Sequence, residues 1–250
     1  MNQSLTHRVA LVTGGSRGIG RATCFELAAR GARVAVAYRK NAQGAEEVAG
    51  QIRSKGGRAI ALQADHLDPS AAHRAVNQVV TALGPIDILV NNAGEMTDVS
   101  VAHMKDEQWE ESLAINLTGP FRFTRECLPG MKERRWGRII IVSSQVVYTG
   151  SANHAHYTAA KAGLLGFAFS LVKEVGSYGI TVNVVAPGRI TTDLLLERMA
   201  GREEEWMKQT PMRRFGRPEE VAAAIAFLAT EDASYITGAV LNVNGGLVMG

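Results

Sequence analysis

Apolar and polar residues alternate along the chain in two different patterns. Seven short runs rich in β-branched residues, at 8–13, 33–38, 59–64, 87–91, 138–143, 181–186 and 239–243, predict strands. Residues 88–90 and 139–142 are continuously apolar. This pattern is typical of strands that are buried on both faces of a parallel sheet. Such a sheet requires helices on each side of it.

Longer amphipathic stretches lie between these runs. They predict helices at 18–30, 43–55, 69–83, 107–134 and 156–178, and Pro218 followed by two glutamates predicts the start of another. The alternation predicts an α/β fold, a single-domain Rossmann-type doubly wound sandwich in which a seven-stranded parallel sheet has helices on both faces. No Pro-, Gly- or Ser-rich linker interrupts the chain, so we expect one domain over 1–250.

The mostly helical insertion at about 190–217 lies between the last two predicted strands. Helices inserted near the carboxyl edge of such a sheet are suited to cover a substrate, which predicts a lid. The apolar side chains of this insertion could instead pack against the body of the protein, as helical leucines and methionines commonly do.

Composition excludes several other classes. Hydrophobic residues make up 46% of the 250 residues and charged ones 20%, which excludes a disordered or fibrous chain. No apolar run approaches the roughly 18 residues of a membrane span, and a net charge of +3 is too small to indicate nucleic acid as a partner. The first residues contain no apolar signal region, and Cys24 and Cys127 form no disulfide or zinc spacing. We therefore expect a cytoplasmic protein.

A glycine-rich turn, Thr13-Gly14-Gly15-Ser16-Arg17-Gly18-Ile19-Gly20, joins the first predicted strand to the first helix. Glycines let the backbone approach a pyrophosphate, and the N-terminus of the helix presents N–H groups to it. The turn therefore predicts a dinucleotide site, with Gly14, Ser16, Arg17, Gly18, Ile19 and Gly20 as contacts.

The spacing of this turn, TGxxxGxG, resembles that of the short-chain dehydrogenase/reductase family, and further motifs agree along nearly the full length. Asn91-Asn92-Ala93-Gly94 matches the NNAG element, and Pro187, Gly188, Ile190 and Thr192 match the PGxIxT element. The resemblance implies that Asn92, Ala93 and Gly94 line the adenosine and ribose of the cofactor. It also implies that Thr192 bonds the nicotinamide carboxamide.

The end of the second strand predicts which cofactor binds. Tyr38, Arg39 and Lys40 stand there, without the carboxylate that bonds the ribose 2′-hydroxyl in NAD sites. The two cations, with Arg17, suit a 2′-phosphate, so we expect NADP(H) rather than NAD(H). The alternative is that the cations form a solvated turn.

The third strand is followed by two further cofactor candidates. The resemblance implies that Asp65 meets the adenine amino group. His66 stands where the family usually has an aliphatic residue, and it either packs on the adenine edge or lies exposed in a loop.

Asn116, Ser144, Tyr157 and Lys161 fall where the family has its catalytic tetrad. Tyr157 and Lys161 are four residues apart in a predicted helix and so share one face. A tyrosine with a pKa near 10 needs a neighbouring ammonium to stabilise its phenolate. The resemblance implies that Ser144 orients a carbonyl, that hydride reaches it from nicotinamide C4, and that Tyr157 protonates the alkoxide. It also implies that Lys161 holds the nicotinamide ribose, and that Asn116 kinks its helix and anchors a water that relays protons to Lys161.

A binding protein that senses NADP without catalysis is the alternative of a different class, because a fold does not determine an activity. Such a protein is expected to lose one of Ser144, Tyr157 or Lys161, and all three are present.

The chain most resembles the 3-oxoacyl-[acyl-carrier-protein] reductases and acetoacetyl-CoA reductases, on residues 136–139, 214–220 and 244–250. This implies a 3-oxoacyl thioester as substrate, carried by acyl-carrier protein or CoA. The alternative is a small ketone, quinone, sugar, steroid or cyclic alcohol. The expected substrate contacts are Ser144, Val146, His154, Tyr157 and Glu95. His154 and His156 without nearby acids are too few for a closed metal site, so we expect no metal.

Lys132, Arg134, Arg135 and Arg138 stand against only Glu133 within 131–138. A basic surface there would suit an acidic carrier protein, although a solvated basic turn is equally compatible with the sequence. The family resemblance further implies a homotetramer.

Overall fold

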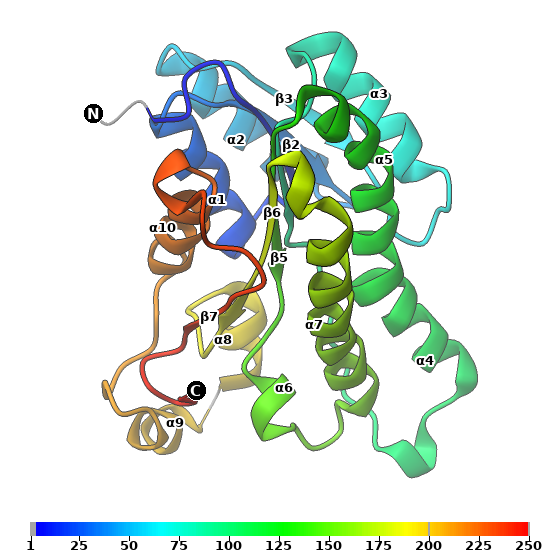
Figure 1. Ribbon diagram of the computed structural model, residues 1–250. Coiled ribbons are helices and arrows are strands. Elements are labelled where there is room, and N and C mark those ends of the chain that lie inside the picture. The colour runs from blue at the N-terminus through cyan, green and yellow to red at the C-terminus, as the bar shows by residue number, and fades with distance from the viewer. Residues whose placement is uncertain (1–3, 200, 250) are drawn as a thin grey trace.

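The computed structural model describes residues 4–199 and 201–249 of the protein (Figure 1). Residues 1–3, 200 and 250, which the predicted domain and lid include, lie outside the described residues. The centre is a seven-stranded parallel sheet with the order β3-β2-β1-β4-β5-β6-β7. Its strands are β1 (Val9–Thr13), β2 (Arg33–Tyr38), β3 (Ala59–Gln63), β4 (Ile88–Asn91), β5 (Gly137–Val142), β6 (Ile180–Pro187) and β7 (Val240–Val243).

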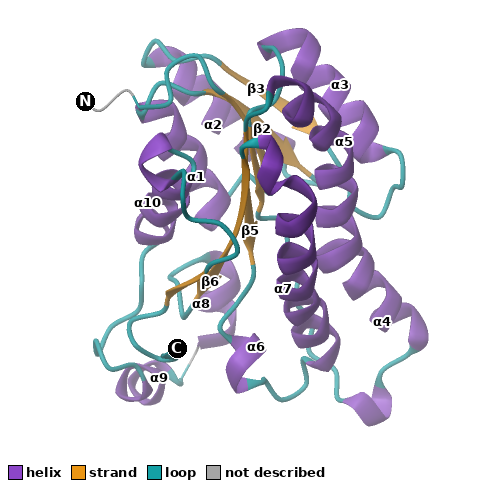
Figure 2. Ribbon diagram, viewed as in Figure 1, coloured by secondary structure: helices purple, strands orange, loops and turns teal. Residues whose placement is uncertain are grey.

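Two layers of helices enclose the sheet, which is seen nearly edge-on in Figure 2. One face carries α1 (Gly18–Ala29), α2 (Ala42–Ser54) and α10 (Pro218–Leu228). The other carries α3 (Ala71–Leu83), α4 (Asp106–Leu113), α5 (Gly119–Arg134) and α7 (Ala155–Val175). The predicted doubly wound α/β fold is therefore confirmed, and each of the seven strands begins and ends within one residue of its predicted position.

The core consists of two clusters, one on each face of the sheet. Neighbouring residues of a strand point to opposite faces, so Val12 lies in one cluster and Leu11 in the other. Every residue of β1, β5 and β6 is buried. This two-sided burial accounts for the continuous apolar runs in the sequence. Cys24 and Cys127 are buried free thiols, one in each cluster.

The predicted helix 107–134 differs from the structure. It is divided into α4 and α5 by a π-helical segment, η2 (Ala114–Thr118), with Asn116 at its centre. The Asn116 side chain donates through Nδ2 to the Ser112 carbonyl oxygen at 3.0 Å. In an unbroken α-helix that carbonyl would accept from the Asn116 backbone N–H, so the side chain competes with the helical pattern.

The shorter elements lie between the main helices and strands. They are η1 (Val101–His103), α6 (Val146–Thr149), η3 (Gly176–Tyr178), α8 (Asp193–Met199), α9 (Glu203–Gln209) and η4 (Glu231–Ala233). α6, α8 and α9 lie beyond the carboxyl ends of the strands, at the bottom of Figure 1. Within the described part of the chain, no helix is both long and apolar enough to cross a bilayer.

The strand order places a crevice at a defined point. The chain moves outward from β1 through β2 to β3 and then returns to β4 on the other side of β1. Loops leaving β1 and β4 therefore diverge at their carboxyl ends, where doubly wound proteins bind ligands.

Candidate active site

A cavity of about 1250 Å³ lies at this carboxyl edge. It exceeds the roughly 300–1,000 Å³ of ordinary small-molecule pockets, so it has room for a dinucleotide beside a substrate. It extends from the glycine turn and Arg39 to Ser144, Tyr157 and Leu195. Among the described residues, every predicted site residue lines it except Tyr38, Asp65 and Asn116.

The glycine turn forms one wall of the cavity, and its glycines bring the backbone itself to the surface of that wall. Gly14 and Gly18 have φ of 66° and 52°, a region that glycine adopts without strain. A Cβ at Gly14 would lie 2.9 Å from the Ala93 Cα, and one at Gly20 would overlap the Gly14 carbonyl oxygen. These close approaches leave a bare backbone cradle at the N-terminus of α1, which fits a pyrophosphate.

Hydrogen bonds join the NNAG loop to the glycine turn. The Thr13 hydroxyl oxygen accepts from the backbone N–H groups of Asn92 at 3.0 Å and Ala93 at 3.1 Å. The Asn92 side chain donates to the Thr13 carbonyl oxygen at 2.9 Å. Thr13, which the sequence analysis did not assign to the site, therefore holds the two cofactor loops together.

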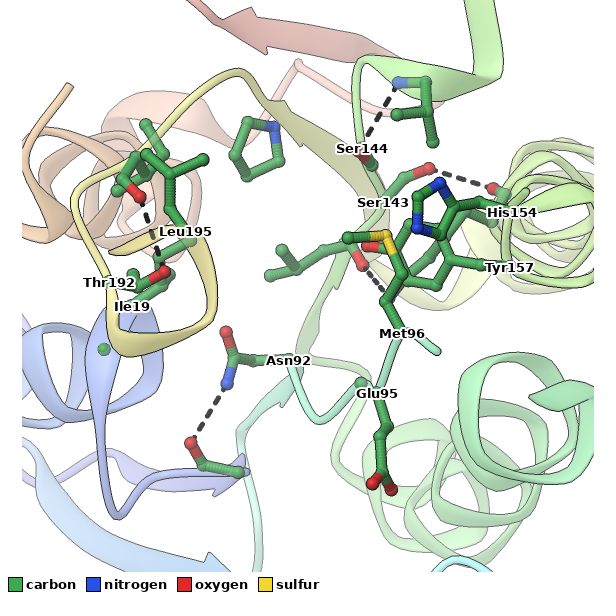
Figure 3. A pocket seen from close by; sticks show the side chains of 18 of the residues that line it. Ile19, Asn92, Glu95, Met96, Ser143, Ser144, His154, Tyr157, Thr192 and Leu195 are labelled. Atoms are coloured by element: carbon green, nitrogen blue, oxygen red, sulfur yellow. Dashed lines mark hydrogen bonds between the residues drawn. The ribbon is translucent and has the colours of Figure 1, made fainter. Parts of the chain in front are cut away.

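The loop after β6 lies over the glycine turn. A Cβ at Gly18 would come within 3.1 Å of the Thr192 Cγ2, and Figure 3 shows Ile19, Thr192 and Leu195 gathered on one side of the cavity. The glycine turn, the NNAG loop and this loop together would hold NADP(H) or NAD(H).

The adenosine end of the cavity carries charged groups. The Arg39 Nε lies 3.2 Å from Asp65, and its NH1 lies 2.6 Å from Glu95. Lys40 and Arg17 are exposed and line the same end. Tyr38 is absent from the described cavity lining because its ring packs against the core cluster under α1 and α2.

Glu95 lies differently from its expected position beside the substrate. Its carboxylate is paired with Arg39, and in Figure 3 its side chain points away from Tyr157 and His154. The backbone of Glu95 lies near the catalytic groups, whereas its carboxylate lies at the adenosine end of the cavity.

His66 is buried, so it is not an exposed loop histidine. Its Nδ1 lies 2.8 Å from the Ile115 carbonyl oxygen, and its ring lies 5.2 Å from that of Phe123. Burial lowers the pKa of its imidazole. Because a Cβ at Gly119 would overlap this ring, a glycine is needed where α5 begins.

Lys161 and Tyr157 lie one turn apart on α7. Lys161 is 3% exposed, and its Nζ donates to the Val142 carbonyl oxygen at 2.9 Å. The same Nζ lies 5.7 Å from the centroid of the Tyr157 ring. Burial lowers the pKa of Lys161 to about 8.

Asn116 lies behind the cavity wall. Its Oδ1 accepts from the Glu95 backbone N–H at 3.2 Å, and its Nδ2 donates to the Glu95 carbonyl oxygen at 2.9 Å. A Cβ at Gly94 would lie 3.0 Å from the Asn116 Oδ1 and 3.2 Å from the Lys161 Nζ. The missing side chain at Gly94 therefore leaves room for both the Asn116 amide and the Lys161 ammonium beside the loop.

The substrate half of the cavity brings together residues from β5, α7 and the loop after β4. Figure 3 shows Ser144, His154 and Tyr157 around one space, with Met96 beside them. The Ser144 Oγ accepts from the Val146 backbone N–H at 3.4 Å. This places a hydroxyl and a phenol at the same end of the cavity, as carbonyl reduction requires.

Both histidines before Tyr157 have polar neighbours. His154 Nε2 lies 2.8 Å from the Asp98 carboxylate, and its Nδ1 lies 2.9 Å from the Ser151 hydroxyl. His156 is buried, with its Nε2 2.9 Å from the Thr97 hydroxyl, and burial lowers its pKa. The sequence analysis missed Asp98 because no spacing links the loop after β4 to the start of α7.

Comparison with known proteins agrees with this geometry. The model of the short chain dehydrogenase family matches residues 8–203. The chain belongs to this family. It is 43% identical to the 3-oxoacyl-[acyl-carrier-protein] reductase of Synechocystis sp., covering 98% of this chain and 99% of the relative. It is also 43% identical to the 3-oxoacyl-[acyl-carrier-protein] reductase FabG of Escherichia coli, covering 97% of this chain and 98% of the relative.

Solved structures of family members are similar throughout. A blue fluorescent protein from a metagenomic library, in complex with NADPH, is 37% identical, with a TM-score of 0.93 over 98% of this chain and all of the other. A double mutant of a Serratia marcescens short-chain dehydrogenase/reductase is 36% identical, with a TM-score of 0.92 over 98% and 99% of the two chains. The protein is an oxidoreductase of the short-chain type.

Proposed function

We propose that the protein is an NADPH-dependent reductase that converts a 3-oxoacyl thioester to the 3-hydroxyacyl form. The observation that carries the proposal is the assembly of Ser144, Tyr157 and Lys161 at one end of a cavity whose other end is the glycine turn. The relatives at 41–43% identity that are named 3-oxoacyl-[acyl-carrier-protein] reductases support this substrate class.

The chain's own groups divide the chemistry among them. NADPH, when bound, supplies the hydride. The Ser144 hydroxyl hydrogen-bonds the substrate oxygen, and the Tyr157 hydroxyl gives its proton to the oxygen as negative charge develops there. The Lys161 ammonium beside the ring stabilises the phenolate that remains. Asn116 holds the backbone of Glu95 and so positions the loop next to Lys161.

The preference for NADPH rests on the cations at the adenosine end. Arg39 and Lys40 follow β2 where an NAD site carries an acid, and Arg17 faces the same end of the cavity. Guanidinium groups match the geometry of phosphate oxygens. Arg39→Asp should lower the ratio of kcat/KM for NADPH over NADH by at least about tenfold. An unchanged ratio would refute the assignment.

A carrier protein would meet a smaller basic surface than the sequence predicts. Arg138 is 2% exposed and paired with Glu231, and the Arg134 Nε lies 3.6 Å from the Asp87 carboxylate, so neither presents its full charge. Lys132 and Arg135 remain, with their cationic groups 5.1 and 5.7 Å from the Tyr178 ring. We infer that these two cations dock an acidic carrier, and that their charge reversal raises KM for the carrier thioester alone.

Two further expectations belong to the same proposal. A homotetramer is supported by the half-exposed rings of Phe121 on α5 and Phe169 on α7, the two helices that the family resemblance implies pair across two-fold axes. A monomeric mass in solution at micromolar concentration would refute it. We also expect the enzyme to act in the cytoplasm.

One panel of NADPH oxidation assays tests the activity. It compares acetoacetyl-CoA, a 3-oxoacyl carrier thioester, a diketone and a cyclic ketone. Turnover of the thioesters is expected, and turnover of only the unthiolated ketones would refute the substrate class. If none of these substrates supports the oxidation of NADPH, the result would favour the non-catalytic sensor.

Tyr157→Phe tests the catalytic assignment separately. It should abolish turnover while NADPH still binds, because only the phenolic hydroxyl, the proton donor, is lost. Tyr148→Phe, the same change at a half-exposed tyrosine of α6, is the matched control. Retained activity in Tyr157→Phe would overturn the assignment.

A further inference from the structure

The Arg39 guanidinium has a carboxylate near each of its three nitrogens. Asp65 lies 3.2 Å from Nε, Glu95 lies 2.6 Å from NH1, and Glu111 lies 3.8 Å from NH2. The three acids come from separate segments, namely the ends of β3 and β4 and the helix α4. The one cation is outnumbered, so this group is net negative at the end of the cavity where a 2′-phosphate is expected.

Glu95 differs from the other two acids in its position. It makes the shortest contact with Arg39, and it lines the cavity, whereas Asp65 and Glu111 do not occur among the described lining residues. Its side chain is 50% exposed. A ligand group that binds Arg39 from the cavity therefore lies beside the Glu95 carboxylate.

A phosphate and a carboxylate compete for the same guanidinium N–H groups. Both are anions, so they also repel each other at the 4–6 Å separation that sharing one guanidinium imposes. A bound 2′-phosphate must either displace Glu95 from NH1 or tolerate its charge. A 2′-hydroxyl, as in NADH, meets neither cost.

We propose that Glu95 is a specificity-determining residue whose carboxylate competes with the 2′-phosphate of NADPH for Arg39. This inference rests on the proposed use of NADPH. Glu95 thereby weakens NADPH binding and leaves NADH binding nearly unaffected, which reduces the discrimination that Arg39 would otherwise provide.

The backbone of Glu95 is held in place, so only its side chain takes part in the competition. Asn116 accepts from the Glu95 N–H and donates to its carbonyl oxygen. These two bonds hold the main chain beside the catalytic groups whichever way the carboxylate points. Glu95→Gln removes the charge, keeps the shape, and leaves both backbone bonds in place.

The test measures cofactor binding without any ketone. Dissociation constants of NADPH and NADH are obtained from nicotinamide fluorescence for the wild type and for Glu95→Gln. NADPH should bind the variant about two- to fivefold more tightly, the range of one half-exposed ion pair, and NADH should change by less than about twofold. The gain should shrink in about 0.5 M salt, because salt screens the charge.

Two further variants make the result specific. Glu110→Gln removes the same charge from an exposed position on α4 and should leave both constants unchanged. On an Arg39→Met background, Glu95→Gln should bring a smaller gain for NADPH, because the shared cation is gone and only the direct repulsion between the two anions is relieved.

The inference would be overturned if Glu95→Gln bound NADPH no more tightly than the wild type, or if its affinity for NADH increased by the same factor. A wild-type protein that binds NADPH but reduces no ketone would refute the proposed function, and the competition would still be measured by binding.

Discussion

The buried ammonium of Lys161 destabilises the cofactor-free fold, and its removal should make the protein more stable while abolishing activity. Burial lowers the Lys161 pKa from its ordinary 10.5 to about 8. One pKa unit corresponds to about 1.36 kcal/mol, so the folded state carries a penalty of about 3 kcal/mol at neutral pH. Lys161→Met preserves the length of the side chain and removes this penalty.

The substitution also has a cost. The Val142 carbonyl oxygen loses the donor that lies 2.9 Å away, and an unpaired buried carbonyl costs about 1–2 kcal/mol. The net expectation is a gain of about 1–2 kcal/mol at pH 7. For a chain of this size, each kcal/mol raises Tm by about 2–4 °C.

The pH dependence separates the two effects. Below pH 8, Lys161 is protonated in the folded and unfolded states, so the full penalty applies to the wild type. Between pH 8 and 10.5 the unfolded chain binds more protons, so the wild type gains stability relative to the variant as pH rises. The advantage of Lys161→Met should therefore vanish near pH 10 and then reverse, because the cost at Val142 does not titrate.

Urea unfolding of both proteins without cofactor, at pH 7 and pH 10, measures this difference. The control is Lys173→Met, at an exposed position of the same helix, which should show no comparable change between the two pH values. An equal difference in stability between Lys161→Met and the wild type at both pH values would refute the reasoning. The effect of the substitution would then not come from removing the buried charge of Lys161.

Other substitutions test the close approaches in the structure. Gly119→Ala should lower the free energy of unfolding by about 1–3 kcal/mol, because its Cβ would overlap the His66 ring, whereas Gly166→Ala, with open space around it, should be neutral or stabilising in the same urea titration. Gly94→Ala should lower kcat about tenfold or more with an unchanged unfolding midpoint, because its Cβ would crowd the Asn116 Oδ1 at 3.0 Å and the Lys161 Nζ at 3.2 Å and shift both groups. A kcat within twofold of the wild type would contradict that reading of Gly94.

The pattern of the sequence predicted the strands well and one helix poorly. Strands such as β5 are buried on both faces, so their apolar runs are unbroken and their ends are visible. The periodicity does not show the interruption at 114–118, and only the family resemblance implied a kink at Asn116, because the interruption depends on Asn116 bonding both Ser112 and the backbone of Glu95. A carboxamide within a helix is a mediocre helix former, but its residue type alone does not reveal which partners its side chain will find.

The chemistry of the site followed from short motifs, since the glycine turn, Ser144, Tyr157 and Lys161 each have a local spacing or a strand end to identify them. Their residue types and order were therefore determined by the chain alone. Charge was decided by tertiary structure. Glu95 turned toward Arg39, 56 residues away, and Arg138 became buried against Glu231, 93 residues away. An ionisable side chain acts through whichever partner the fold brings within a few ångströms, and sequence separation contains no information about that distance.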